Sequence, residues 1–278
     1  MSERRFQLVD VFHSGPFSGN PVAVVLDAGG LTTEDMQRIT RWFNLSETTF
    51  LLPPETPGAD YRVRIFTLDR ELPFAGHPTL GSAHAWRLAV GSDKTEVVQQ
   101  CAIGLVRVRF DGDRPAFAAP PLVRKGPLDA AKRSEIVEVL RIEPDDILSA
   151  EWADNGPGWV LVQLASAEAV LAVDPLRYLD RRVEIGLVGA HPAGHEAAFE
   201  IRALFSDATG GIIEDPVTGS LNASVAQCLL ADGRATAPYV AAQGTKLGRA
   251  GRIHVSEADG DIWIGGETRT LFSGTGSF

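Results

Sequence analysis

The sequence is poor in cysteine and lacks any cluster of positive charge, and both absences narrow its possible functions. Only Cys101 and Cys228 occur in 278 residues, which is too few and too far apart for a disulfide scaffold. The formal net charge is −10, and no run of Lys and Arg is present, so we expect no nucleic-acid partner. An acidic ligand would have to be held by local groups, such as the backbone amides at a helix start.

Long apolar segments are also missing. The first twelve residues are charged and then strand-like, without the apolar core and cleavage site of a signal peptide. The longest uncharged stretch, 216–231, is too short to span a bilayer and carries several polar side chains. We therefore expect a soluble cytoplasmic protein without a membrane partner.

Several familiar catalytic and cofactor motifs are absent. There is no G-x-S-x-G nucleophile motif and no G-x-G-x-x-G dinucleotide motif. The segment 76–82 imitates the spacing of a phosphate-binding loop, but the lysine that would follow its second glycine is missing. His191 and His195 are four residues apart, but Pro192 and Gly194 favour a loop over a metal-binding helix. We expect neither a cofactor nor a metal.

The most informative feature that is present is an internal repeat with an offset of 138 residues. Six identities occur without a gap: Arg64/Arg202, Asp69/Asp207, Pro78/Pro216, Gly81/Gly219, Ser82/Ser220 and Ala85/Ala223. In this window, from Arg64 to Ala85, roughly one or two identities are expected by chance at average composition. At the centre of the match His77 aligns with Asp215. Two similar halves with different ionisable groups at one position predict a small-molecule site at their junction.

Each copy of the repeat predicts a buried helix that opens at a proline, Pro78 or Pro216. The helix expected at 78–90 has only Arg87 as a charged residue, and the one at 216–231 has none, so both must be buried on all sides. The surrounding segments are short and strand-like. The sequence therefore predicts an α+β fold in which a strongly curved sheet surrounds one central helix, formed twice. Strands are expected at 6–12, 22–26, 48–52, 61–67, 159–163, 199–205, 238–242, 252–255 and 262–264. Amphipathic helices are expected at 32–43 and 128–140, and the apolar stripe of the first consists of Met36, Ile39, Trp42 and Phe43.

The two predicted helix starts are candidate anion sites, because free backbone N–H groups and the positive end of the helix dipole meet there. Asp215 has two possible roles. Asp before Pro is common as a helix cap, but the aligned His77 is a poor cap, which favours an acid–base or substrate-binding pair.

Glu47 is a second candidate, between an amphipathic helix and an apolar strand. It is either an exposed loop carboxylate or a partly buried proton shuttle at the junction of the two halves.

The sequence resembles the PhzF-like family, named for the isomerase of phenazine biosynthesis, over essentially its whole length. The resemblance is carried by the segments 19–23 (GNPVA), 44–50 (NLSETTF), 64–67 (RIFT), 72–78 (LPFAGHP) and 214–220 (EDPVTGS). It implies the diaminopimelate-epimerase-like fold, with a first lobe of residues 1–118 plus 266–278 and a second lobe of residues 119–265. It also implies a homodimer that needs no cofactor or metal.

The resemblance further implies the role of each site residue. Glu47 corresponds to the general acid/base, and His77 and Asp215 to the pair that orients the substrate and assists proton movement. The substrate-binding positions implied are Ser46, Gly76, Gly219 and Ser220. Related epimerases use two cysteines, but neither cysteine here lies in a glycine-rich helix start, so a two-thiol racemase is not expected.

These observations predict a cofactor-independent isomerase. Glu47 would move a proton within a small carboxylated substrate similar to trans-2,3-dihydro-3-hydroxyanthranilate. Two alternatives stay open: an epimerase or racemase with carboxylate or histidine bases, and a non-catalytic protein that binds an anionic metabolite.

Overall fold

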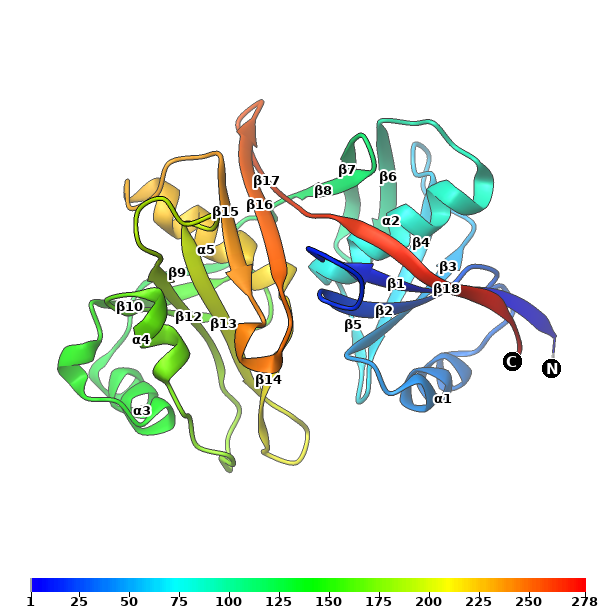
Figure 1. Ribbon diagram of the computed structural model, residues 1–278. Helices are drawn as coiled ribbons and strands as arrows, with labels where there is room; N and C mark the ends of the chain where they lie inside the picture. Colours follow the sequence, from blue (N-terminus) through cyan, green and yellow to red (C-terminus); the bar gives the residue numbers. More distant parts are fainter. Residues whose placement is uncertain (1) are drawn as a thin grey trace. The chain divides into compact units, whose positions relative to one another are not determined.

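The computed structural model describes residues 2–278 and shows a mixed α+β chain dominated by strands (Figure 1). The chain folds into two compact units, Met1–Ala118 with Gly265–Phe278, and Ala119–Ile264. In each unit a strongly curved sheet surrounds an apolar helix, which confirms the expected fold class.

The sheet of the first unit includes the last strand of the chain. Its strands are β1 (Glu3–Val11), β2 (Asn20–Val25), β3 (Glu47–Leu52), β4 (Tyr61–Thr67), β5 (Glu71–Leu72), β6 (Glu96–Cys101), β7 (Gly104–Asp111), β8 (Arg114–Ala118) and β18 (Thr268–Ser277). Strand β1 pairs antiparallel with both β2 and β18. The pairs β2–β3 and β4–β6 are parallel, and α1 (Thr33–Phe43) and α2 (Gly76–Val90) provide the crossovers that parallel pairs require.

The second unit repeats this succession. Its strands are β9 (Arg124–Pro127), β10 (Ser149–Asp154), β11 (Val160–Gln163), β12 (Glu184–Ala190), β13 (Phe199–Ser206), β14 (Ile212–Asp215), β15 (Tyr239–Gln243), β16 (Gly251–Ala258) and β17 (Asp261–Gly265), and its α-helices are α3 (Ala130–Leu140), α4 (Ala167–Ala172) and α5 (Gly219–Ala231). Strand β10 pairs with β9 and β11 as β1 pairs with β18 and β2. The pairs β11–β12 and β13–β15 are parallel across α4 and α5. The repeat therefore extends to the topology of both units.

Helices α2 and α5 are the central helices that the sequence predicts. Helix α2 contacts β1, β2, β3, β4, β6, β8 and β18. The contact is so close that a Cβ atom at Gly81 would lie 2.4 Å from Val22 Cγ1, and one at Gly186 would lie 2.2 Å from Leu221 Cδ1 of α5. Although both helices are apolar, no helix within residues 2–278 is long and apolar enough to cross a membrane.

The outer face of the first sheet is covered by α1, which begins with a capping box at Thr32 and Asp35. Met36 is buried against Phe50 and Phe66. The prediction that Trp42 belongs to this apolar stripe is wrong, because its side chain is 85% exposed. Met36, Ile39 and Phe43 follow helical spacing, whereas Trp42 is displaced to another face of the helix.

The prolines of the repeat do not open the central helices, contrary to the prediction. Helix α2 starts at Gly76, so that Pro78 is its third residue, and α5 starts at Gly219 after the N-cap Thr218, so that Pro216 precedes it. The strand register shows why the ungapped match fails here. Phe66 pairs with Glu71 and Leu204 with Glu214, so the hairpin of β13 and β14 has five more residues beyond this pair than the hairpin of β4 and β5.

The longer hairpin of the second unit changes which site residues of the two units correspond to each other. The offset is 138 along β4 and β13 but 143 at the helix starts. His77 therefore corresponds to Ser220, and not to Asp215. Asp215 is the last residue of β14, and Thr218 is the N-cap of α5, so the interpretation of Asp215 as a helix cap is also wrong.

Candidate active site

Glu47 begins β3, where it pairs with Val22 on one side and Thr67 on the other. Its side chain is only 15% exposed, and Glu47 Oε2 lies 3.3 Å from His77 Nε2. The alternative of an exposed loop carboxylate is therefore excluded. A carboxylate that is mostly buried beside an imidazole is a suitable group for proton transfer.

His77 is the second residue of α2, and it is 3% exposed. Its Nδ1 atom lies 3.2 Å from Asn20 Nδ2, so both ring nitrogens have a polar neighbour. Burial lowers the pKa of His77 to about 3, because the charged imidazolium loses its hydration. The imidazole beside Glu47 is therefore neutral near pH 7.

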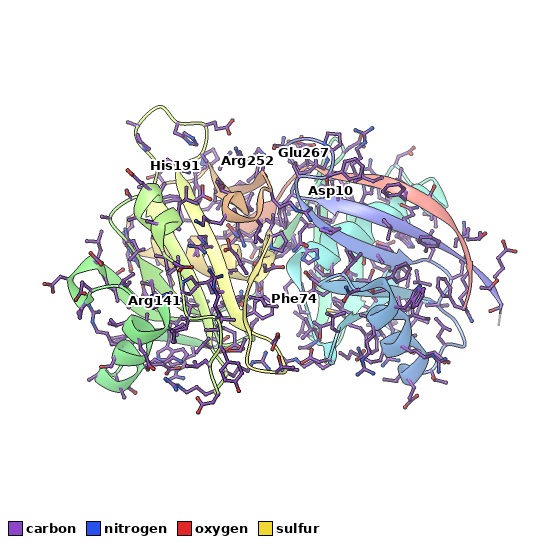
Figure 2. All side chains as sticks on the ribbon, turned by 60° about the horizontal axis from the view of Figure 1, so that its bottom comes forward. Asp10, Phe74, Arg141, His191, Arg252 and Glu267 are labelled. Atoms are coloured by element: carbon purple, nitrogen blue, oxygen red, sulfur yellow. The ribbon has the colours of Figure 1, made fainter. Side chains whose placement is uncertain are left out.

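The turn that leads to Asn20 is fixed by Asp10 of β1 (Figure 2). Asp10 Oδ1 accepts a hydrogen bond of 2.9 Å from the Gly19 N–H, and Oδ2 accepts one of 3.1 Å from the Ser18 N–H. A side chain at position 19 is excluded, because its Cβ would lie 2.1 Å from the Val11 carbonyl oxygen. The segment 19–23 belongs to the family pattern, but sequence reasoning assigned no role to Asn20, because its contact with His77 bridges 57 residues.

The start of α2 offers backbone donors next to His77. Its N-cap is Ala75, whose side chain has no acceptor for the first N–H groups of the helix. Gly76 is buried at the first helical position, and Ser46 is half-buried directly before Glu47. These backbone donors suit an anion such as a carboxylate.

In the second unit, Asp215 is held at the start of α5. Its Oδ2 atom accepts a hydrogen bond of 2.5 Å from Thr218 Oγ1. Gln243 of β15 donates through Nε2 to the Asp215 carbonyl (3.1 Å) and to Thr218 Oγ1 (3.0 Å). Asp215 is 8% exposed, so its carboxylate is oriented and mostly buried.

Ser220 follows Gly219 at the second position of α5, and its hydroxyl group is oriented by an indole. Trp159 Nε1 donates to Ser220 Oγ at 3.2 Å, and Asn155 Nδ2 donates to the Ser220 carbonyl at 2.8 Å. Because Ser220 Oγ accepts from Trp159, its own proton must point away from the indole. Sequence reasoning missed Trp159 and Asn155, since they precede Ser220 by more than sixty residues and no motif marks them.

The cysteines lack the properties of catalytic thiols. Burial raises the pKa of Cys101, and it raises that of Cys228 to about 11. A thiol needs the reverse shift to act as a base near neutral pH. This agrees with the expectation that the chain is not a two-thiol racemase.

The histidine pair predicted to lie in a loop does so. His191 and His195 stack with ring centroids 3.9 Å apart, and His191 Nε2 lies 3.1 Å from Glu200 Oε2. Within residues 2–278, no group of three or more His, Cys, Asp or Glu is arranged to hold a metal ion.

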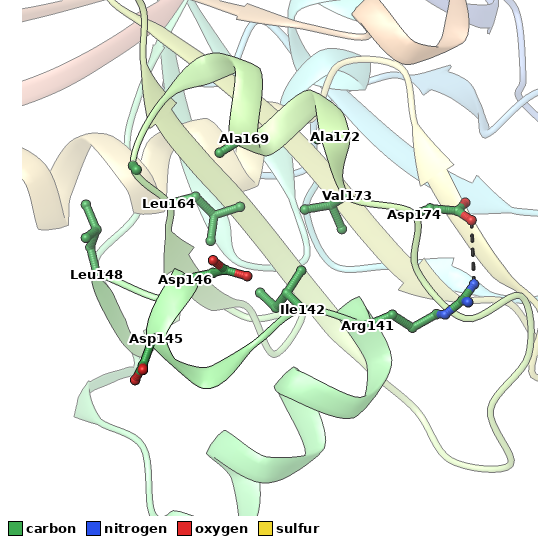
Figure 3. A pocket seen from close by; sticks show the side chains of 11 residues that line it. Arg141, Ile142, Asp145, Asp146, Leu148, Leu164, Ala169, Ala172, Val173 and Asp174 are labelled. Carbon is green, nitrogen blue, oxygen red and sulfur yellow. Dashed lines mark ion pairs between the residues drawn. The ribbon is translucent and has the colours of Figure 1, made fainter.

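A cavity of about 520 Å³ lies in the second unit, and none of the predicted site residues lines it (Figure 3). Apolar side chains such as Leu164 and Val173 line it, and Arg141 and Asp174 form an ion pair of 3.6 Å at its rim. Its charged side chains are exposed, so they are poorly suited to orient a ligand.

The buried imidazole predicts a specific pH dependence. In the unfolded chain the pKa of His77 should be about 6.5, so between about pH 6.5 and pH 3 the unfolded chain binds a proton that the folded chain does not. The free energy of unfolding should therefore fall as the pH decreases through this range. An NMR titration should show no protonation of the His77 ring between about pH 8 and pH 5, whereas a midpoint near 6.5 would contradict its buried neutral state.

Comparison with known proteins assigns the chain to a family. The family model described as phenazine biosynthesis-like protein matches residues 9–275. The chain is 34% identical to trans-2,3-dihydro-3-hydroxyanthranilate isomerase of Pseudomonas fluorescens, over 88% of this chain and 87% of the relative. It is 33% identical to antisense-enhancing sequence 1 of Schizosaccharomyces pombe, over 99% of both chains.

The solved structures agree with this assignment. One similar structure is that of a predicted epimerase from Pseudomonas aeruginosa, with a TM-score of 0.80, 29% identity and 98% of each chain covered. The chain therefore belongs to the phenazine biosynthesis-like (PhzC-PhzF) protein family and is an enzyme of the isomerase class.

Proposed function

We propose that Glu47 catalyses an isomerisation by moving one proton within a small carboxylated substrate. The distance of 3.3 Å between Glu47 Oε2 and His77 Nε2 carries this proposal. A general acid/base must lie within reach of the groups with which it exchanges protons. Its low exposure also limits contact with water, to which a migrating proton would otherwise be lost.

The proton balance requires only one carboxyl group. Glu47 as a carboxylate removes a proton from one carbon, and the electron pair of that C–H bond shifts into the substrate. The resulting carboxylic acid returns the proton to a second carbon and becomes a carboxylate again. His77 stays neutral throughout, because burial lowers its pKa to about 3, and it orients the carboxyl group.

Substrate binding is proposed for the helix starts. Gly76 with the first N–H groups of α2, and Gly219 with Ser220 in α5, would hold a carboxylate of the substrate. Ser46 would contribute next to Glu47, and Asp215 would assist the movement of the proton. A cyclic substrate similar to trans-2,3-dihydro-3-hydroxyanthranilate is favoured by the 34% identity to the Pseudomonas fluorescens enzyme of that name.

The test is an NMR time course with trans-2,3-dihydro-3-hydroxyanthranilate in deuterated water. We expect the substrate signals to decay and a positional isomer to appear only when protein is present. Binding without any conversion would reject this substrate.

The same experiment separates the alternatives. An epimerase, favoured by the likeness to the predicted epimerase of Pseudomonas aeruginosa, would invert a stereocentre and leave the double bonds in place. A non-catalytic metabolite-binding protein would bind carboxylates with the same affinity after Glu47→Gln, and it would convert none of them.

The homodimer and the cytoplasmic location expected from the sequence remain predictions. Light scattering of the purified protein tests the first, with twice the chain mass of 29.8 kDa as the expected result. Fractionation of cells that produce the protein tests the second.

A further inference from the structure

We propose that Asn20 is a positioning residue that fixes the tautomer of His77, so that the imidazole carries its proton on Nε2, the ring nitrogen next to Glu47. This inference deepens the proposed function and rests on Glu47 as the acid/base. Asn20 itself would not touch the substrate. Its effect would pass through the imidazole to the carboxylate that moves the proton.

The contacts on the two sides of the ring carry the argument. Asn20 Nδ2 lies 3.2 Å from His77 Nδ1, and an amide nitrogen can only donate. His77 Nδ1 must therefore present a lone pair, and a neutral imidazole with a lone pair on Nδ1 carries its proton on Nε2. Since Nε2 is 3.3 Å from Glu47 Oε2, this proton is on the ring nitrogen next to the carboxylate.

The opposite orientation of the amide is unfavourable. If the amide oxygen of Asn20 faced Nδ1, the proton of the imidazole would have to lie on Nδ1. The lone pair of Nε2 would then face the negative charge of Glu47, and the two would repel each other. The orientation seen here is the one that stabilises Glu47 as a carboxylate, which is the form that removes a proton.

The surroundings keep Asn20 in place. Asn20 is fully buried at the start of β2, and Pro21 restricts its backbone to extended conformations. Directly before it, Gly19 and Ser18 are bonded to the carboxylate of Asp10. Asp10 thus fixes the turn before Asn20, Asn20 contacts His77, and His77 lies next to Glu47. Through these contacts, strand β1 fixes the position of the reacting carboxylate.

The tautomer can be read directly by ¹⁵N NMR of the histidine rings in the complete protein, with the His77 signals assigned through a His77→Gln variant. We expect Nδ1 to be the unprotonated nitrogen and Nε2 the protonated one at neutral pH. The reverse assignment in the wild-type protein would overturn the inference without any need for a variant. This reading does not require turnover, so it is independent of whether Glu47 catalyses the reaction.

Asn20→Asp provides the functional test, because a carboxylate of almost the same shape accepts and does not donate. The proton of His77 should move to Nδ1, and kcat/KM should fall by about a hundredfold, as expected for a misplaced reacting group. The acid limb of the pH profile should shift, and KM should change little. Asn222→Asp, the same change at a buried amide of the second unit, should leave the His77 nitrogen signals unchanged. A folded Asn20→Asp variant with the wild-type tautomer and pH profile would overturn the inference.

Discussion

Replacing Glu47 by glutamine is expected to lower the rate of isomerisation by roughly 10²–10⁴-fold, the usual contribution of a general acid/base. Glutamine has nearly the same shape, so the pairing of β3 with β2 and β4 should persist. It cannot take up a proton from carbon at neutral pH. The loss should therefore be found in kcat, and substrate binding at the helix starts should change little. Steady-state kinetics with the substrate of the NMR time course would measure both.

A matched carboxylate separates this effect from a general loss of charge. Glu55 forms an exposed ion pair with Arg62 in the same unit, and Glu55→Gln should keep the wild-type rate. A Glu47→Gln variant with undiminished kcat would exclude Glu47 as the proton shuttle.

The sequence predicted the central helices well, because their physical signal is strong. A helix without charge along two or more turns has no face for water, and α5 and most of α2 are indeed buried. The prediction fails in the last turn of α2, where Leu88 and Val90 are 57% and 56% exposed. The strand part of the repeat was equally reliable, since Arg64 and Arg202 occupy the same place in β4 and β13. The helix part was misleading. Chance identities at Pro, Gly and Ser concealed the five additional residues in the second hairpin.

The residues of the site also fall into two groups, those that sequence motifs indicate and those that only the structure shows. Glu47 and His77 could be predicted because they lie in motifs, and the structure places them within 3.3 Å of each other. Asn20 and Trp159 act through contacts with residues 57 and 61 positions away. Such contacts depend on how strands and helices pack, and the local sequence does not indicate them. The tautomer of His77 and the orientation of the Ser220 hydroxyl therefore become visible only in the fold.

Each copy of the repeat contains an ion pair between an arginine and a glutamate. Breaking the buried pair of the second unit should lower the free energy of unfolding far more than breaking the more exposed pair of the first unit. Arg202 Nη2 lies 2.9 Å from Glu214 Oε2, and the two side chains are 4% and 8% exposed. Nη1 of Arg202 also donates to the carbonyls of Val170 and Val173, at 3.0 and 2.7 Å. These carbonyls lie at the end of α4, where the Val170 carbonyl also accepts from the Val173 N–H at 3.4 Å.

Arg202→Met is therefore expected to lower the free energy of unfolding by about 3–5 kcal/mol, the cost of leaving one charge of a buried pair without its partner. The equivalent pair of the first unit, Arg64–Glu71, is more exposed, at 19% and 38%. Arg64→Met should cost about 1 kcal/mol or less, because water screens that pair. Urea denaturation of the two variants measures the difference.

A second substitution identifies the cause of the loss. Glu214→Leu in the Arg202→Met background removes the carboxylate that has lost its partner, so it should recover a large part of the stability, although the two carbonyls at the end of α4 still lack the guanidinium donor. If Arg202→Met lowered the free energy of unfolding no more than Arg64→Met, the charge of the arginine would not explain why both copies of the repeat contain it. The packing of the aliphatic part of the side chain, which methionine imitates in both places, would then be the shared requirement.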